Sequence, residues 1–67
     1  MSSFATLDQV AAALLTRVGN ELSLRPVSTR VLLRTGVNLR APRPDQATDK
    51  ACIAKVVSAL AEMGFPL

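Results

Sequence analysis

The hydrophobic residues of the C-terminal third recur at steps of three and four, which is the repeat of one helical face. They are Ile53, Val56, Val57, Leu60 and Met63. Gly64 follows where a helix end favours a left-handed residue, and Pro66 prevents the helix from resuming. The pattern therefore predicts a helix over about 46–63, with Asp45 or Thr48 as its N-cap.

A second amphipathic stretch begins after a short lead, residues 1–3, that we expect to be disordered. Thr6 is the expected N-cap, because Gln9 stands three residues later in capping-box position. The expected inward face carries Leu7, Val10, Ala11, Leu14, Leu15, Val18 and Leu22. These positions predict a helix over about 6–22. Gly19 and Asn20 either end it early or are tolerated before Glu21, and the pattern leaves both interpretations open.

A shorter helix is predicted over about 26–35. Pro26 suits a first helical turn, where the N–H that proline lacks has no partner. Ser23 or Ser28 is then the candidate cap. The inward stripe of this helix is expected to comprise Val27, Val31, Leu32 and Thr35.

The connection to the last helix starts at Gly36, which we expect just past the helix end with Val37 folding back onto the last turn. Residues 37–39 are predicted to form a brief extended piece. Residues 40–44 read RAPRP, and each proline restricts the residue before it away from helical geometry. This segment is expected to be a stiff, exposed, basic loop.

The length of 67 residues allows one domain, and the three helices define it as an all-α, three-helix domain over 1–67. Hydrophobic residues make up 49% of the chain, yet a chain this short buries only about 60% of its unfolded surface. We therefore expect a second copy or a partner to cover part of the apolar surface, and a homodimer is predicted.

Positive charge is concentrated in the middle of the chain, where residues 25–43 contain five arginines and no acid. The net charge is +3, so the flanking segments together carry an excess of acids. Arginines on a helix and a stiff loop can neutralise DNA phosphates with release of counterions. The alternative is a solvated face whose arginines pair with Asp45, Asp49 or an acidic protein partner. Only two residues, Phe4 and Phe65, are aromatic, which disfavours base stacking on single strands or RNA.

Two segments carry a family resemblance. The segment VSTRVLLRTGV resembles the first helix and turn of a helix-turn-helix, and IAKVVSALAEMGF resembles the end of a winged-helix recognition helix. The resemblance covers about half of the chain and includes no wing, and the connection with its two prolines is longer than that of a compact helix-turn-helix. It implies that the last helix faces the major groove. The DNA-binding residues expected from charge and resemblance together are Arg25, Arg30, Arg34, Arg40, Arg43, Gln46, Thr48, Lys50 and Lys55, while Asp49 is explained by the helix dipole.

A second hypothesis is a protein-interaction module, an adaptor or inhibitor of the kind found in phages and plasmids. The first helix has a wide apolar stripe, and part of it would form a dimer seam or a partner surface if exposed. The candidate interface residues are Val10, Leu14, Leu15 and Val18. Ordinary core packing is the simpler explanation of the same stripe.

Catalysis and cofactor chemistry have no candidate residues. The chain contains no histidine and one cysteine, Cys52, which excludes a zinc site of the usual kind within one chain and leaves no nucleophile–base pair. Cys52 is expected to be a small buried hydrophobe. We expect no enzyme activity and no cofactor. No apolar run reaches the roughly 20 residues of a membrane span, and no signal-peptide pattern is visible, so a cytoplasmic location is predicted.

Overall fold

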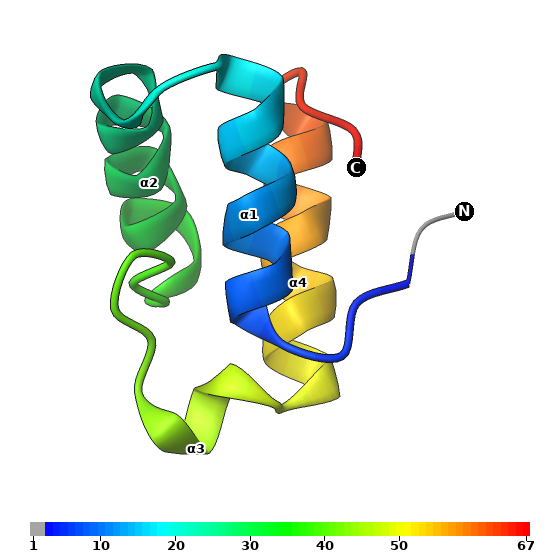
Figure 1. Ribbon diagram of the computed structural model, residues 1–67. Helices are drawn as coiled ribbons and strands as arrows, with labels where there is room; N and C mark the ends of the chain where they lie inside the picture. Colours follow the sequence, from blue (N-terminus) through cyan, green and yellow to red (C-terminus); the bar gives the residue numbers. More distant parts are fainter. Residues whose placement is uncertain (1–2) are drawn as a thin grey trace.

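The computed structural model describes residues 3–67, and these form four helices without a strand (Figure 1). They are α1 (Leu7–Val18), α2 (Glu21–Thr35), the short α3 (Pro44–Ala47) and α4 (Lys50–Glu62). The predicted all-helical class is confirmed, and the brief extended piece expected at residues 37–39 forms no strand and reaches a turn at Leu39. Met1 and Ser2, part of the lead expected before the first helix, lie outside the described residues. No helix within residues 3–67 combines the length and the apolar character needed to cross a membrane.

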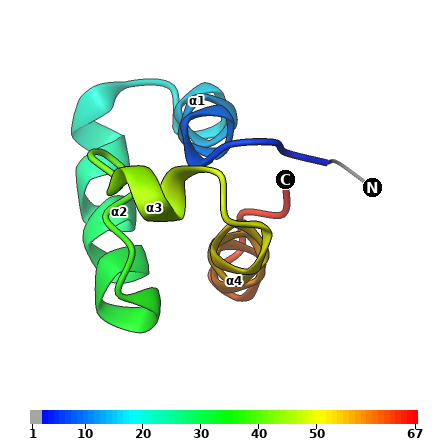
Figure 2. The same ribbon diagram turned by 90° about the horizontal axis from the view of Figure 1, so that it is seen from below.

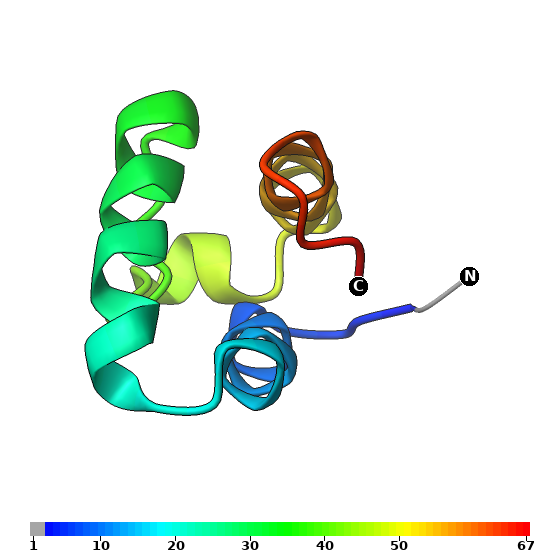
Figure 3. The same cartoon turned by 90° about the horizontal axis from the view of Figure 1, so that it is seen from above.

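Three long helices surround one core, and α3 closes one end of it. In Figure 1, α1 and α4 run in the same direction and α2 runs the opposite way. Figures 2 and 3 show α1 and α4 nearly end-on but α2 from its side, so α2 is tilted against the other two. It packs on both of them. One side of α2 is therefore covered along its length, and the other side faces outward.

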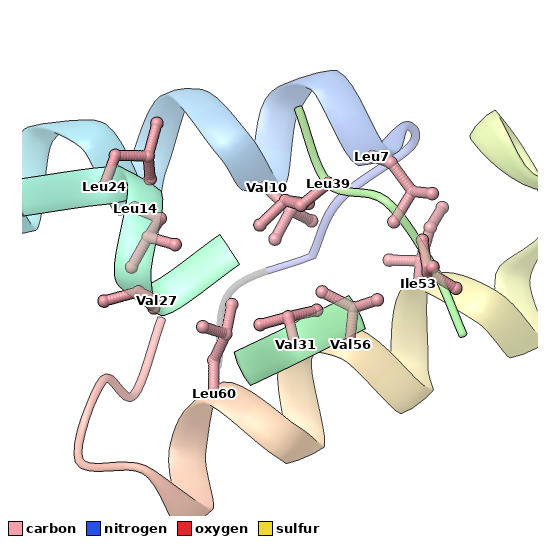
Figure 4. Close-up of a cluster of buried hydrophobic side chains, with 11 residues drawn as sticks. Leu7, Val10, Leu14, Leu24, Val27, Val31, Leu39, Ile53, Val56 and Leu60 are labelled. Atoms are coloured by element: carbon pink, nitrogen blue, oxygen red, sulfur yellow. The ribbon is translucent and has the colours of Figure 1, made fainter. Parts of the chain in front are cut away.

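The core is aliphatic and draws on every long helix (Figure 4). Its fully buried side chains are Leu7, Val10, Leu14, Val31, Val37, Leu39, Val56 and Leu60. The last helix contributes the residues expected from its spacing. Leu39 was not predicted to be in the core, because a single apolar residue between polar neighbours has no periodicity to assign it. It lies in the connection after α2 and extends the core towards α3.

The start of α1 agrees with the sequence. The Thr6 hydroxyl accepts a hydrogen bond from the backbone N–H of Gln9 at 3.2 Å, as expected of a capping box. The Gln9 side chain returns to the backbone N–H of Ala5 at 2.7 Å, one residue before the cap. At the other end, Arg17 donates to the carbonyl oxygen of Pro66 at 2.7 Å. This bond ties the C-terminal segment to α1.

The junction between the first two helices corrects two predicted boundaries. Gly19 ends α1 in the left-handed conformation with a φ of 92°, four residues before the expected end. Asn20 then caps α2, since its side chain accepts from the backbone N–H of Ser23 at 2.8 Å. The second helix thus begins at Glu21, and Pro26 lies inside it rather than in its first turn. The asparagine cap, six residues before Pro26, outweighs the proline signal.

The connection to the last helix also differs from expectation. Gly36 does end α2, with a φ of 75°, and Val37 folds back into the core as predicted. Beyond it, α3 starts at Pro44, so Asp45 belongs to this additional helix. The N-cap of α4 is Asp49, whose carboxylate accepts from the backbone N–H of Ala51 at 2.9 Å. The proposed caps Asp45 and Thr48 are therefore wrong, because α3 takes up that stretch of chain.

Candidate nucleic-acid interface

The arginines expected to form one surface are distributed around α2. Arg25, Arg30 and Arg34 all lie on this helix and are all exposed. At 3.6 residues per turn, Arg25 and Arg34 are roughly 180° apart around the helix axis. They therefore cannot contact the same phosphate backbone while α2 lies along it. Arg40 and Arg43 follow in the connection between α2 and α3.

Three of these arginines have acidic partners within the chain. Arg34 pairs with Glu62 of α4 at 2.9 Å, and Arg40 lies 3.6 Å from Glu21. Arg43 binds Asp45 through two hydrogen bonds of 3.2 and 3.1 Å. The alternative of a face whose arginines pair with Asp45 or Asp49 thus applies to Arg43, whereas the partners of Arg34 and Arg40 are acids that it did not include. All three pairs are exposed, and such pairs contribute at most about 1 kcal/mol each.

Arg25 and Arg30, the other two of these five arginines, are not paired in this way. Within residues 3–67, neither Arg25 nor Arg30 forms an ion pair with an acid. They lie about 140° apart on α2, one on each side of its outward face. Their charge is therefore available to an external partner without breaking an internal contact.

The polar candidates near the last helix are also separated. Gln46 is half-buried in α3, and Thr48 lies at the junction between α3 and α4. Lys50 is the first residue of α4 and Lys55 lies in its middle, and both are exposed. Of the four, only the two lysines lie on the long helix that the resemblance identifies with a recognition helix.

The outward face of α4 carries a stripe of small residues that the sequence analysis missed, and the exposed Glu62 lies between this stripe and Lys55. The members of the stripe are exposed and spaced at three, four and three residues: Ala51, Ala54, Ser58 and Ala61. Lys50 and Lys55 are about 140° apart around the helix, and this stripe lies in the arc between them. The spacing of these small residues is visible in the sequence, but neither charge nor apolar periodicity marks alanine as a functional residue.

A shallow groove between α2 and α4 borders this face. It is lined by Arg34, Thr35, Lys55, Ser58, Ala59 and Glu62. The Glu62 carboxylate is held by Arg34, so its charge is offset within the groove. The other edge of the α4 face adjoins Ser3 and Phe4 of the N-terminal segment. The small-residue face therefore lies between α2 and the N-terminal segment.

The residues expected at a dimer or partner interface lie in or near the core. Val10 and Leu14 of α1 are fully buried within the single chain, so they offer no surface to a second protein. Leu15 and Val18 are half-buried and pack against the core. The large apolar side chains that residues 3–67 leave exposed are instead Leu22, Leu32 and Leu33, all on α2. A partner surface on α1 would thus rest on Leu15 and Val18 alone.

Cys52 is half-buried and packs against the core cluster, close to the small buried hydrophobe expected. Comparison with known proteins adds no identification. No family model, no curated protein and no solved structure matches this chain. The functional argument therefore rests on the two outward faces of α2 and α4.

Proposed function

We propose that this protein binds duplex DNA by placing the outward face of α4 in the major groove. The observation that carries the proposal is the stripe of Ala51, Ala54, Ser58 and Ala61 with a lysine on each side. The helix-turn-helix resemblance implies a recognition role for the same helix.

The small residues suit the shape of the groove. The major groove of B-DNA admits an α-helix, and side chains near the helix axis decide how closely the backbone approaches the bases. Alanine methyl groups can contact thymine methyl groups, and a serine hydroxyl can bond to any base edge. Large apolar side chains would hold the helix away from the bases, and this face of α4 has none.

The charges suit the groove walls. With the stripe towards the bases, Lys50 and Lys55 extend to opposite sides, where the two phosphate backbones lie. Arg34, which shares the groove between α2 and α4 with Lys55, is the next cation on that side. Its ion pair with Glu62 is exposed and weak, so a phosphate can replace the carboxylate at small cost. The expected role of Arg34 is kept, whereas Arg25 lies too far around α2 to take part.

The test is binding to a fluorescent 30-base-pair duplex over a series of salt concentrations. The variant Lys50→Glu/Lys55→Glu should lose at least about tenfold in affinity, and the slope of log affinity against log salt should fall by about 2 units. The matched control is Arg25→Glu/Arg30→Glu, which makes the same change in charge on α2. It should leave the slope nearly unchanged.

Two results would refute the proposal. One is no binding by the unmodified protein at about 50 mM salt, where even non-specific binders retain affinity. The other is an equal loss of affinity in both variants, because that would mean that net charge rather than the α4 face controls binding.

A further inference from the structure

The outward face of α2 has a second pattern that DNA binding does not use. Leu22, Pro26, Thr29 and Leu33 follow one another at four, three and four residues, the spacing of the a and d positions of a coiled-coil seam. Leu22 and Leu33 are within about 20° of each other around the helix and roughly 16 Å apart along it. The core residues Leu24 and Val31 lie on the opposite side of α2.

The side chains along this face are apolar or already hydrogen-bonded, although the Leu22 carbonyl lacks the helical N–H that Pro26 cannot supply. Leu22 is 78% exposed and Leu33 is 82% exposed, far above the other large apolar residues described. Between them, Pro26 has no N–H to satisfy. The Thr29 hydroxyl already donates to the carbonyl oxygen of Arg25 at 3.0 Å. A partner that covers the face would therefore bury two leucines without leaving a side-chain hydrogen-bonding group unpaired.

The flanking charges define the partner. In the heptad register set by the two leucines, Arg25 occupies a g position and Arg30 an e position, the sites that form ion pairs across a coiled-coil seam. Neither of these two arginines has an acidic partner among residues 3–67. We propose that the outward face of α2 docks an acidic amphipathic helix of another protein, with apolar residues against Leu22 and Leu33 and carboxylates against Arg25 and Arg30.

The charges and the leucines of this face disfavour two other binding partners, a second copy of the chain and duplex DNA. A parallel second copy would place Arg25 against Arg30 of its partner, since g and e positions five residues apart face each other. An antiparallel second copy would place no acid opposite either arginine and would gather four positive charges around one seam. Duplex DNA would meet two exposed leucines at the centre of the face. An acidic helix satisfies both the apolar and the charged positions.

The test uses two synthetic peptides of three heptads that share leucine at a and d. One carries glutamate at every e and g position, and the other carries lysine. Binding is followed by fluorescence anisotropy of the labelled peptide at low and moderate salt. The acidic peptide should bind at least about tenfold more tightly than the basic one, because its charges oppose those of the α2 face.

Three variants separate the contributions. Leu22→Gln/Leu33→Gln and Arg25→Glu/Arg30→Glu should each weaken the acidic peptide at least about tenfold, since they remove the apolar and the charged contacts respectively. The matched control Lys50→Glu/Lys55→Glu, with the same change in charge on α4, should bind it as before. The Arg25→Glu/Arg30→Glu variant should also gain affinity for the basic peptide. Because this is a gain, loss of folding cannot produce it.

Several outcomes would overturn the inference. One is equal affinity for the acidic and the basic peptide. Another is that the α4 control loses as much affinity for the acidic peptide as the α2 variants do. A third is a homodimer that Leu22→Gln/Leu33→Gln converts to monomer, which would identify a second copy as the occupant. The fourth is loss of duplex DNA binding in that leucine variant. The DNA proposal is unaffected by failure of the peptide test, because it depends on the α4 lysines.

Discussion

The hydroxyl of Ser28 gives the sharpest test of the packing around α2. Ser28 lies on the inward side of this helix and is only 5% exposed. Its Oγ atom is buried and has no hydrogen-bond partner among residues 3–67. We predict that Ser28→Ala stabilises the protein, although it removes atoms from a buried position.

The magnitude follows from three contributions. Removing a buried unpaired hydroxyl recovers about 1–3 kcal/mol of desolvation cost. Alanine adds roughly 0.5 kcal/mol of helix propensity. The lost contacts of one heavy atom subtract up to about 1 kcal/mol, so the net gain lies between about 0.5 and 3.5 kcal/mol, with a middle value of about 2 kcal/mol. For a chain of 67 residues, an unfolding entropy of roughly 2.1 cal/mol/K per residue converts the middle value into a rise in Tm of about 14 °C.

The assay is thermal unfolding followed by circular dichroism at 222 nm, repeated with urea at 25 °C. Ser58→Ala is the matched control, because Ser58 is exposed on α4 and gains only the propensity term, about 3–4 °C. A Tm for Ser28→Ala at or below that of the unmodified protein would refute the reasoning. In that case the Ser28 hydroxyl would make a hydrogen bond in solution that is absent from the structure described here.

Two further changes test the core and a helix end. Leu14→Ala should cost about 2–5 kcal/mol and abolish most cooperative unfolding in urea, since Leu14 is fully buried and a chain this small has a total stability of only a few kcal/mol. Leu22→Ala on the outward face should change the free energy of unfolding by less than about 0.5 kcal/mol. Comparable losses in Leu14→Ala and Leu22→Ala would contradict the assigned core. Gly36→Ala should cost about 1–2 kcal/mol in the same assay, because a φ of 75° is strained for alanine. No steric clash adds to this cost, since no atom of the described residues lies within 4 Å of the added Cβ. No loss would mean that α2 ends in a different conformation in solution.

The sequence predicted the parts of the fold that depend on local rules. The capping box at Thr6 and the apolar spacing of the last helix involve residues within four positions of one another, and both are confirmed. The boundary between α1 and α2 was wrong because two local signals competed. Pro26 is compatible with a first turn, but the Asn20 cap allows a longer helix that buries Leu24. Only the tertiary contact decides between them.

The candidate site was less predictable, because it depends on which way each helix faces. Moving the start of α2 back to Glu21 makes Leu22 part of this helix and places it on the outward face. Counting arginines along the chain gave no account of their angular positions, so residues on opposite sides of α2 were assigned to one surface. The stripe on α4 could have been found from the spacing of small residues alone. The binding partners themselves remain predictions.

The two-residue connection at Gly19 and Asn20 also has a consequence for the order of folding. Only residues 19–20 separate α1 from α2, whereas residues 36–49 separate α2 from α4. Closing the longer connection costs more chain entropy, because it orders more residues, among them those of α3. We therefore expect the α1–α2 hairpin to assemble first and α4 to dock onto it, with higher φ-values at Val10 than at Val56. The helix proposed to enter DNA would then be the last to join the fold.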